Sequence, residues 1–203
     1  MQAIIESSPA PTVISQLDAR QVAQQYVAAQ IDPRFTVNNG EHYNSQSLGR
    51  VLWRFIICQE QDPLSALMVD AQTGQVIALS QAEIQVVREK AAIYTARKQG
   101  VLPVNERGYV LGEYARCEAS GYLDDNISMF YGAVDPVFIQ NDPPIWQVTI
   151  VFKMYDQGPF TLGIMDVNAK TGDPIPLSPN QIKRIRERTR AIIRSSSSSS
   201  TSC

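Results

Sequence analysis

The chain has 203 residues, of which 44% are hydrophobic and 19% are charged, a composition typical of a globular protein with room for one large domain or two small ones. Its formal net charge of −2 gives no global reason to expect a nucleic-acid-binding protein. No apolar run reaches the roughly 20 residues that span a bilayer. The N-terminal segment lacks the basic start and the apolar core of a signal peptide, so we expect a cytoplasmic protein.

The start of the chain predicts an arm, a helix and a sheet. Residues 1–17, rich in Ser and Pro, are expected to form a flexible arm. Asp18 is an expected N-cap, with Gln21 at the capping-box position, for a helix that ends before Pro33. β-Branched and aromatic residues then predict antiparallel strands within residues 34–45, 50–60, 64–71 and 75–79. A turn or bulge is expected at Asn39-Gly40.

A capping box marks the next helix. Ser80 and Glu83 have the spacing of that motif, which predicts a helix to about Lys98 with Gly100 at its C-terminal exit. The same motif returns far along the chain, where Ser178 is the expected N-cap of a last helix. Pro179 then stands at the first helical position and Gln181 at the capping-box position.

One segment of the sequence occurs twice. VDAQTGQVIALSQAEIQVVRE at Val69–Glu89 and VNAKTGDPIPLSPNQIKRIRE at Val167–Glu187 agree at about half of their positions without a gap. Trp146 stands in a strand pattern like that of Trp53. We interpret the chain as two tandem repeats of one unit.

The second repeat is predicted to contain the same elements as the first. Asn105 is the expected start of a helix over 106–120, in which Val110 and Tyr114 match Val22 and Tyr26 of the first helix. Strands are expected within residues 126–139, 145–155 and 158–177, with an enlarged hairpin at Tyr155–Pro159.

The predicted fold class is α+β. Each repeat is expected to pack a helix on a sheet of three or four antiparallel strands and to end in a further helix. The predicted boundaries are 18–98 for the first repeat with its linking helix, 99–194 for the second with its last helix, and 195–203 for a disordered Ser-rich tail.

The repeated unit resembles a PepSY domain, the module found in peptidase propeptides and in YpeB-like proteins. The resemblance rests on LWRFIICQ followed by LSALMVDAQTGQVIAL, and on IWQVTIVFK followed by TLGIMDVNAKTGDPIPL. It covers about residues 18–80 and 105–178. It implies a small binding or inhibitory module, often acting on a peptidase, rather than a catalyst.

Several residues were considered for chemistry. Asp70 suits a general base, a metal ligand or a turn, and its replacement by Asn168 in the second repeat favours the turn. His42 is the single histidine, so no two-histidine zinc site exists and an exposed or strand-edge position is expected. Trp53 and Trp146 are expected in the two cores, with ligand stacking as the alternative. We expect no catalytic residue, metal or cofactor.

The three cysteines are Cys58, Cys117 and Cys203, and they form no CxxC pair. Cys58 lies in an apolar run and Cys117 in an expected helix. Both are therefore expected to be small buried side chains rather than redox groups or metal ligands. Cys203 ends the Ser-rich tail.

The last helix carries the strongest functional signal, because its polar positions are almost all basic. Its cations are Lys183, Arg184, Arg186, Arg188, Arg190 and Arg194, opposed by Glu187. They are candidates for contact with a protein partner, an anionic membrane surface or nucleic acid. The alternative is a solvated helix whose late cations complement its dipole.

These patterns favour a non-enzymatic protein-binding, regulatory or assembly module. Its partner is expected to contact the sheets or the basic helix, and the PepSY resemblance makes regulation of a peptidase one form of this function. The rival hypothesis is an enzyme or small-ligand-binding protein that uses a cleft between the two repeats.

Overall fold

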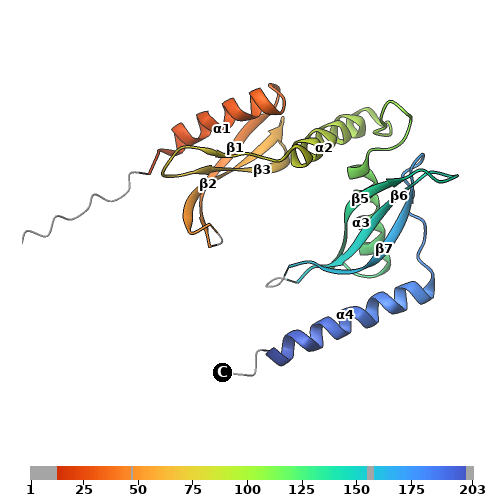
Figure 1. The fold of residues 1–203 in the computed structure, drawn as a ribbon. Helices are drawn as coiled ribbons and strands as arrows, with labels where there is room; N and C mark the ends of the chain where they lie inside the picture. Colours follow the sequence, from red (N-terminus) through yellow and green to blue (C-terminus); the bar gives the residue numbers. More distant parts are fainter. Residues whose placement is uncertain (1–12, 47, 155–157, 200–203) are drawn as a thin grey trace, which may run out of the picture. The chain divides into compact units, whose positions relative to one another are not determined.

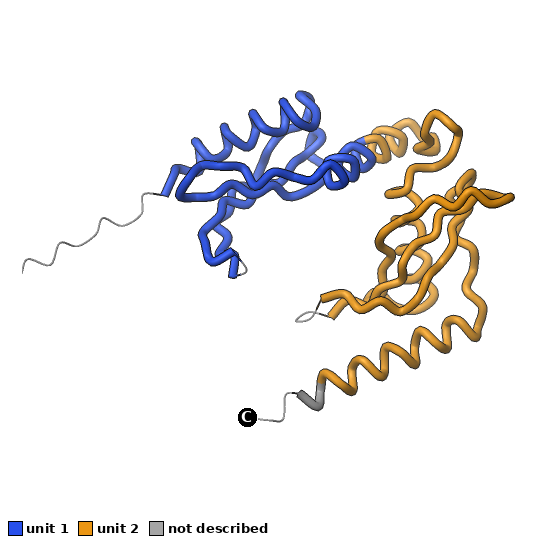
Figure 2. The backbone as a smooth tube through the Cα atoms, in the orientation of Figure 1, with its two compact units in different colours: residues 1–91 blue, residues 92–203 orange. Residues whose placement is uncertain are grey.

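The computed structural model describes residues 13–46, 48–154 and 158–199 (Figure 1). Within them the chain forms four helices and two antiparallel sheets, one of four strands and one of three, which confirms the α+β class. The chain divides into two compact units, residues 1–91 and 92–203, and the boundary lies inside a helix (Figure 2). The predicted repeats meet near the end of the same helix, at residue 98.

Unit 1 packs one helix and the start of another on its sheet. Its elements are α1 (Gln16–Gln30), β1 (Thr36–Ser45), β2 (Arg50–Gln59), β3 (Asp62–Asp70), β4 (Val76–Ile77) and α2 (Gln81–Gln99), and the strand order is β1-β2-β3-β4. Small residues on α1, among them Ala19 and Ala23, are completely buried and let the helix approach the sheet closely. They pack in one hydrophobic cluster with Phe55, Leu67 and Ile84.

The first helix begins earlier than the sequence predicted. Ser15, not Asp18, is the N-cap, because its hydroxyl accepts the backbone N–H of Asp18 at 3.1 Å. Asp18 stands three residues later and accepts the Ser15 hydroxyl at 2.7 Å. Ile14 is also fixed, since its N–H donates to the carbonyl of Ala71 at 2.8 Å. Residues 13–17 therefore do not belong to the predicted flexible arm, and residues 1–12 lie outside the described part of the chain.

Unit 2 has the same kinds of elements. These are α3 (Gly112–Asn126), β5 (Tyr131–Ile139), β6 (Ile145–Phe152), β7 (Phe160–Asn168) and α4 (Pro179–Ser199), with the strand order β5-β6-β7. Ala115, Ala119 and Leu123 of α3 are completely buried. They share one hydrophobic cluster with Ile150 of β6 and Ile185 of α4, so both helices pack on this sheet.

The start predicted for the helix over 106–120 was wrong. The side chain of Asn105 accepts the N–H groups of Arg107 and Tyr109 at 2.9 and 3.2 Å, which holds a turn rather than a helix. Val110 is then extended, because its N–H donates to the carbonyl of Ala169 at 2.8 Å. The helix starts only at Gly112.

The predicted disordered tail also begins too early at residue 195. Helix α4 continues to Ser199. Ser195 and Ser196 both donate to the carbonyl of Ile192, at 2.8 and 2.9 Å. Residues 200–203, including Cys203, and most of the predicted Tyr155–Pro159 hairpin lie outside the described residues.

The first strand of each sheet contains one extra residue. The register of β1 shifts between Asn38 and Glu41, and that of β5 shifts between Val134 and Val137. Asn39 and Asp135 sit in these shifts with positive φ angles of 55° and 50°. The bulge predicted at Asn39-Gly40 is thus confirmed, and its counterpart in β5 was not anticipated.

The last predicted strand of the second repeat is reduced to a single bridge. Val167 pairs with Pro174 in isolation, where unit 1 pairs Val69 and Val76 within a strand. Proline has no N–H to donate, so this segment cannot continue a ladder of hydrogen bonds.

Candidate functional site

The segment that repeats in the sequence builds the start of α4. The side chain of Asn168 accepts the N–H groups of Lys170 and Thr171 at 2.8 and 3.2 Å, and Gly172 follows with a φ angle of +80°. Ser178 then accepts the N–H of Gln181 at 3.3 Å, which confirms the predicted cap. A turn and a capping box therefore set where α4 leaves the sheet.

Asp70 holds the corresponding turn in unit 1. Its carboxylate accepts the N–H groups of Gln72 and Thr73, each at 2.9 Å, as predicted for a turn residue. Arg50 also donates to this carboxylate at 2.7 Å, a contact that sequence reasoning missed. The hydrogen bond from Arg50, together with those from the turn, lowers the pKa of Asp70 to about 2. These bonds use the carboxylate structurally.

The other residues considered for chemistry also make structural contacts. His42 is exposed on β1 and stacks on Trp53, with 3.8 Å between ring centroids. Trp53 donates to the carbonyl of Ile14 at 3.2 Å, and Trp146 donates to that of Val110 at 2.9 Å. Both indoles pack against the cores of their units, as predicted.

Two cysteines lie among the described residues, and neither forms a disulfide bond there. Cys58 is buried, as expected, whereas Cys117 is only half-buried. Within the described parts of the chain, no three or more His, Cys, Asp or Glu side chains gather where they could hold a metal ion. No helix described there is both long enough and apolar enough to cross a membrane.

Helix α4 lays its apolar face on the sheet of unit 2. Ile185 is buried, and Ile182 and Ile192 pack partly buried against the same cluster. Thr189 is buried too, and its hydroxyl accepts that of Tyr131 at 3.1 Å and donates to the carbonyl of Ile185 at 3.0 Å. Because this face is covered, the cations of α4 stand on its other sides.

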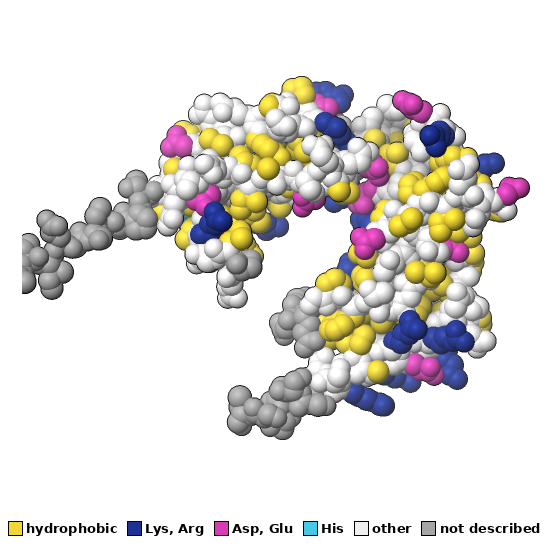
Figure 3. All heavy atoms as spheres, viewed as in Figure 1, with side chains coloured by type: hydrophobic (Ala, Val, Ile, Leu, Met, Phe, Trp, Pro, Cys, Tyr) yellow, Lys and Arg dark blue, Asp and Glu magenta, His cyan; other side chains and the backbone are white. Residues whose placement is uncertain are grey.

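The six candidate cations are not equivalent. Arg188 donates a short hydrogen bond to the carbonyl of Leu162 on β7, so it helps to attach α4 to the sheet. The Nζ atom of Lys183 lies 3.9 Å from Oε1 of Glu187 on the next turn. Among the described residues, no hydrogen bond or ion pair engages the exposed side chains of Arg184, Arg186 and Arg190. Arg194 is exposed as well. Figure 3 shows Lys and Arg side chains gathered over α4.

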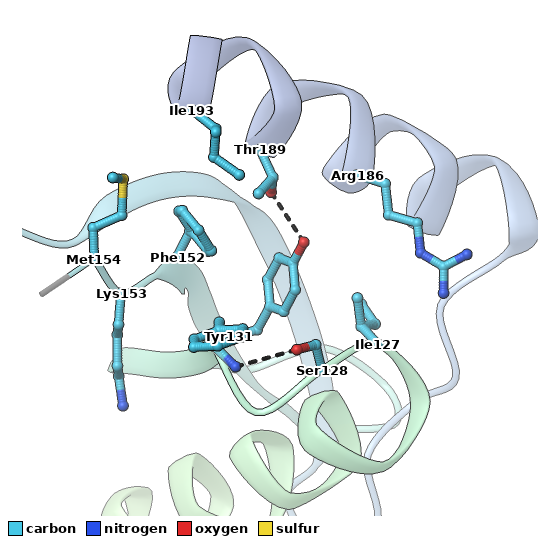
Figure 4. A pocket seen from close by; sticks show the side chains of 10 residues that line it. Ile127, Ser128, Tyr131, Phe152, Lys153, Met154, Arg186, Thr189 and Ile193 are labelled. Carbon is cyan, nitrogen blue, oxygen red and sulfur yellow. Dashed lines mark hydrogen bonds between the residues drawn. The ribbon is translucent and has the colours of Figure 1, made fainter. Parts of the chain in front are cut away.

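Beside this basic face lies an apolar pocket of about 450 Å³ (Figure 4). It opens where the end of α3, the end of β6 and the middle of α4 meet. Its lining comprises Ile127, Ser128, Phe130, Tyr131, Phe152, Lys153, Met154, Arg186, Thr189 and Ile193. Phe130 and Ile193 remain 51% and 45% exposed, so apolar surface is accessible at its mouth.

The polar groups of the pocket have distinct positions. The Tyr131 ring points across the pocket toward α4, where its hydroxyl meets Thr189 (Figure 4). Arg186 projects from α4 on the side of Ile127, whereas Lys153 points away. Sequence reasoning found the basic helix but missed the pocket, because its walls come from three distant segments. The one local signal was the apolar Met129-Phe130 pair ahead of β5.

No known protein family, characterised protein or solved structure matches this chain with significance.

Proposed function

We propose that the chain is a non-enzymatic protein-binding module built from two PepSY-like repeats, and that the basic face of α4 binds an acidic segment of a partner protein. The observation that carries this proposal is the set of exposed cations on α4, Arg184, Arg186 and Arg190, which have no hydrogen-bond or ion-pair partner among the described residues. Such a surface attracts and orients carboxylate-rich segments.

The proposal that the units are two copies of one module is supported by matching contacts. The hydroxyl of Tyr26 accepts the N–H of Leu79 at 2.9 Å, and that of Tyr122 accepts the N–H of Leu177 at 3.0 Å. These pairs support an alignment of the proposed repeats in which Tyr122, rather than Tyr114, matches Tyr26.

A cation on the last helix of each unit makes a matching hydrogen bond. Lys90 donates to the carbonyl of Leu64 at 3.1 Å, as Arg188 does to that of Leu162. The first contact joins α2 to β3, and the second joins α4 to the equivalent position of β7. Arg188 is then part of the shared framework, so it is set apart from the cations that we assign to binding.

A protein segment suits this surface better than a lipid surface. An interfacial helix binds a membrane by burying its own apolar face among the acyl chains. In α4 that face, with Ile185 and Thr189, is already buried against the sheet. A partner must therefore approach the cationic sides of the helix.

Selection from a library of random dodecapeptides displayed on phage tests this function. We expect the full chain to enrich peptides rich in Asp and Glu, and an Arg186→Glu/Arg190→Glu variant to lose that enrichment. The matched control is Arg107→Glu/Lys170→Glu, which makes the same charge change at exposed positions elsewhere in unit 2. Enrichment of neutral or basic peptides, or equal effects of both variants, contradicts the proposal.

A further inference from the structure

We propose that the pocket of unit 2 beside α4 anchors apolar side chains of the same acidic partner, so that the recognised segment has an aliphatic or aromatic residue next to its carboxylates. This inference rests on the proposed function and names the chemistry of the partner. Four observations carry it: the position of Arg186, the contrast with unit 1, the size of the pocket and the nature of its lining.

Arg186 joins the pocket to the basic face. It lines the apolar pocket, and it also lines a second hollow along α4 with Lys183, Glu187 and Arg190. An extended segment that places a carboxylate at Arg186 can thus reach the apolar pocket on one side and further cations on the other. A compact small molecule in the pocket contacts only the first of these two surfaces.

In unit 1 the arginine at the corresponding place is engaged in hydrogen bonds. There Arg88, at the position of Arg186, donates to the carbonyls of Gln30 and Ile31 at the end of α1, each at 3.3 Å. Asp32 and Arg34 form an ion pair at 2.7 Å. The first repeat therefore uses its arginine to cap a helix, which leaves that side chain engaged.

Unit 2 keeps the arginine but replaces the ion pair. Ser128 and Phe130 stand where unit 1 has its ion pair, which exchanges two charges for a small polar and a large apolar side chain. Arg186 makes no bond to the end of α3 among the described residues. The helix position of Thr189 is occupied in unit 1 by Ala91, so the buried hydroxyl pair with Tyr131 also belongs to the second repeat alone.

The volume and the lining of the pocket indicate which side chains it can accept. A pocket of about 450 Å³ has room for more than one large side chain and lies within the size range of specific binding sites. Ile127, Phe152 and Met154 offer aliphatic, aromatic and thioether surface, to which Leu, Met, Phe or Trp side chains are complementary. Such side chains in a pocket, with charges at the rim, are the usual arrangement of an interface hot spot.

The test uses the best acidic peptide from the selection and a copy in which its apolar residues are changed to Ser. Fluorescence anisotropy measures the dissociation constants of both for the full chain. We expect the apolar residues to strengthen binding roughly 10-fold or more. A Phe130→Ser/Ile193→Ser variant should bind the two peptides equally, and with the affinity that the unchanged chain has for the Ser copy. A Val101→Ser/Leu102→Ser control changes exposed apolar residues elsewhere in unit 2 and should keep the preference.

The outcomes separate the two proposals. If the full chain binds the acidic peptide and its Ser copy equally, the pocket is not an anchor, while the basic face remains the partner site. If neither acidic peptide binds better than a neutral one, the proposed function itself fails. If the chain sediments with vesicles of phosphatidylcholine and phosphatidylserine and the Phe130→Ser/Ile193→Ser variant does not, the pocket faces a membrane and the inference is overturned. The comparison of the two peptides uses the unchanged chain, so it does not depend on whether any variant folds.

Discussion

The two turns built by the repeated sequence differ in one hydrogen bond, which Arg50 donates to Asp70. Asp70 and Asn168 both accept backbone N–H groups through a side-chain oxygen, so either residue holds the turn. Only the carboxylate of Asp70 has a second oxygen that accepts from Arg50. In unit 2 the residue at the Arg50 position is Pro143, and the turn holds without a cation.

We expect Asp70→Asn to destabilise unit 1 at neutral pH by about 1–3 kcal/mol, because it removes a charged hydrogen bond and keeps the turn. The pKa of Asp70 is lowered from 3.8 to about 2, so its stabilising effect is present above about pH 4 and is lost as the pH falls from about 4 to 2. The variant and the unchanged chain should therefore converge in stability over that range.

Urea unfolding checks this expectation, followed by fluorescence in a Trp146→Phe background that leaves Trp53 as the only tryptophan. Asn168→Asp is the matched control, since that position lacks the arginine. A stability difference for Asp70→Asn that stays constant down to pH 2 would show that the ion pair is not its cause.

At the scale of the element, a tyrosine in each unit ties the first helix to the segment that precedes the next helix. Tyr26 and Tyr122 leave their helices with their hydroxyls directed at the N–H of a leucine, one residue before a capping serine. This bond fixes where the following helix begins, because an N–H left unpaired in a half-buried place is unfavourable.

We expect Tyr26→Phe and Tyr122→Phe each to cost about 1–2 kcal/mol, because each leaves one backbone N–H without its acceptor. The first should lower the urea midpoint reported by Trp53, and the second the midpoint reported by Trp146. If Tyr114→Phe, and not Tyr122→Phe, lowered the Trp146 midpoint, the alignment of the two repeats by their contacts would be wrong.

Local sequence rules predicted most of the strands and the capping boxes at Ser80 and Ser178, since these depend on neighbouring residues. The capping box predicted at Asp18 was wrong, because Ser15 is the N-cap of α1. Other predictions failed where a distant residue decides the outcome. Asn105 has the sequence features of a helix cap. Val110, however, is held in an extended conformation by its hydrogen bond to the carbonyl of Ala169, so the helix starts later. Arg188 looks like a solvated cation, yet the carbonyl of Leu162 lies within its reach. The pocket has the same cause, because no spacing in the sequence links Ile127, Phe152 and Ile193.

For the whole molecule, the net charge of −2 hides a strong local asymmetry, with the cations of α4 offset by acidic residues elsewhere. Binding of the acidic peptide should therefore weaken as NaCl rises from 50 to 500 mM, because salt screens exposed charges. The preference for the peptide with apolar residues over its Ser copy should persist, since salt does not weaken apolar contacts. Titrations at both salt concentrations check this, and a preference that vanishes with salt would argue against an apolar anchor.

The bulges in β1 and β5 limit how either sheet can be extended. Each is one of the two edge strands of its sheet, and each has one residue with positive φ in its middle, Asn39 or Asp135. A straight strand from another molecule cannot keep its hydrogen bonds in step past such a residue. At the edges formed by β1 and β5, partner recognition by strand addition and fibre-like stacking are both discouraged by a feature that costs only one residue per strand.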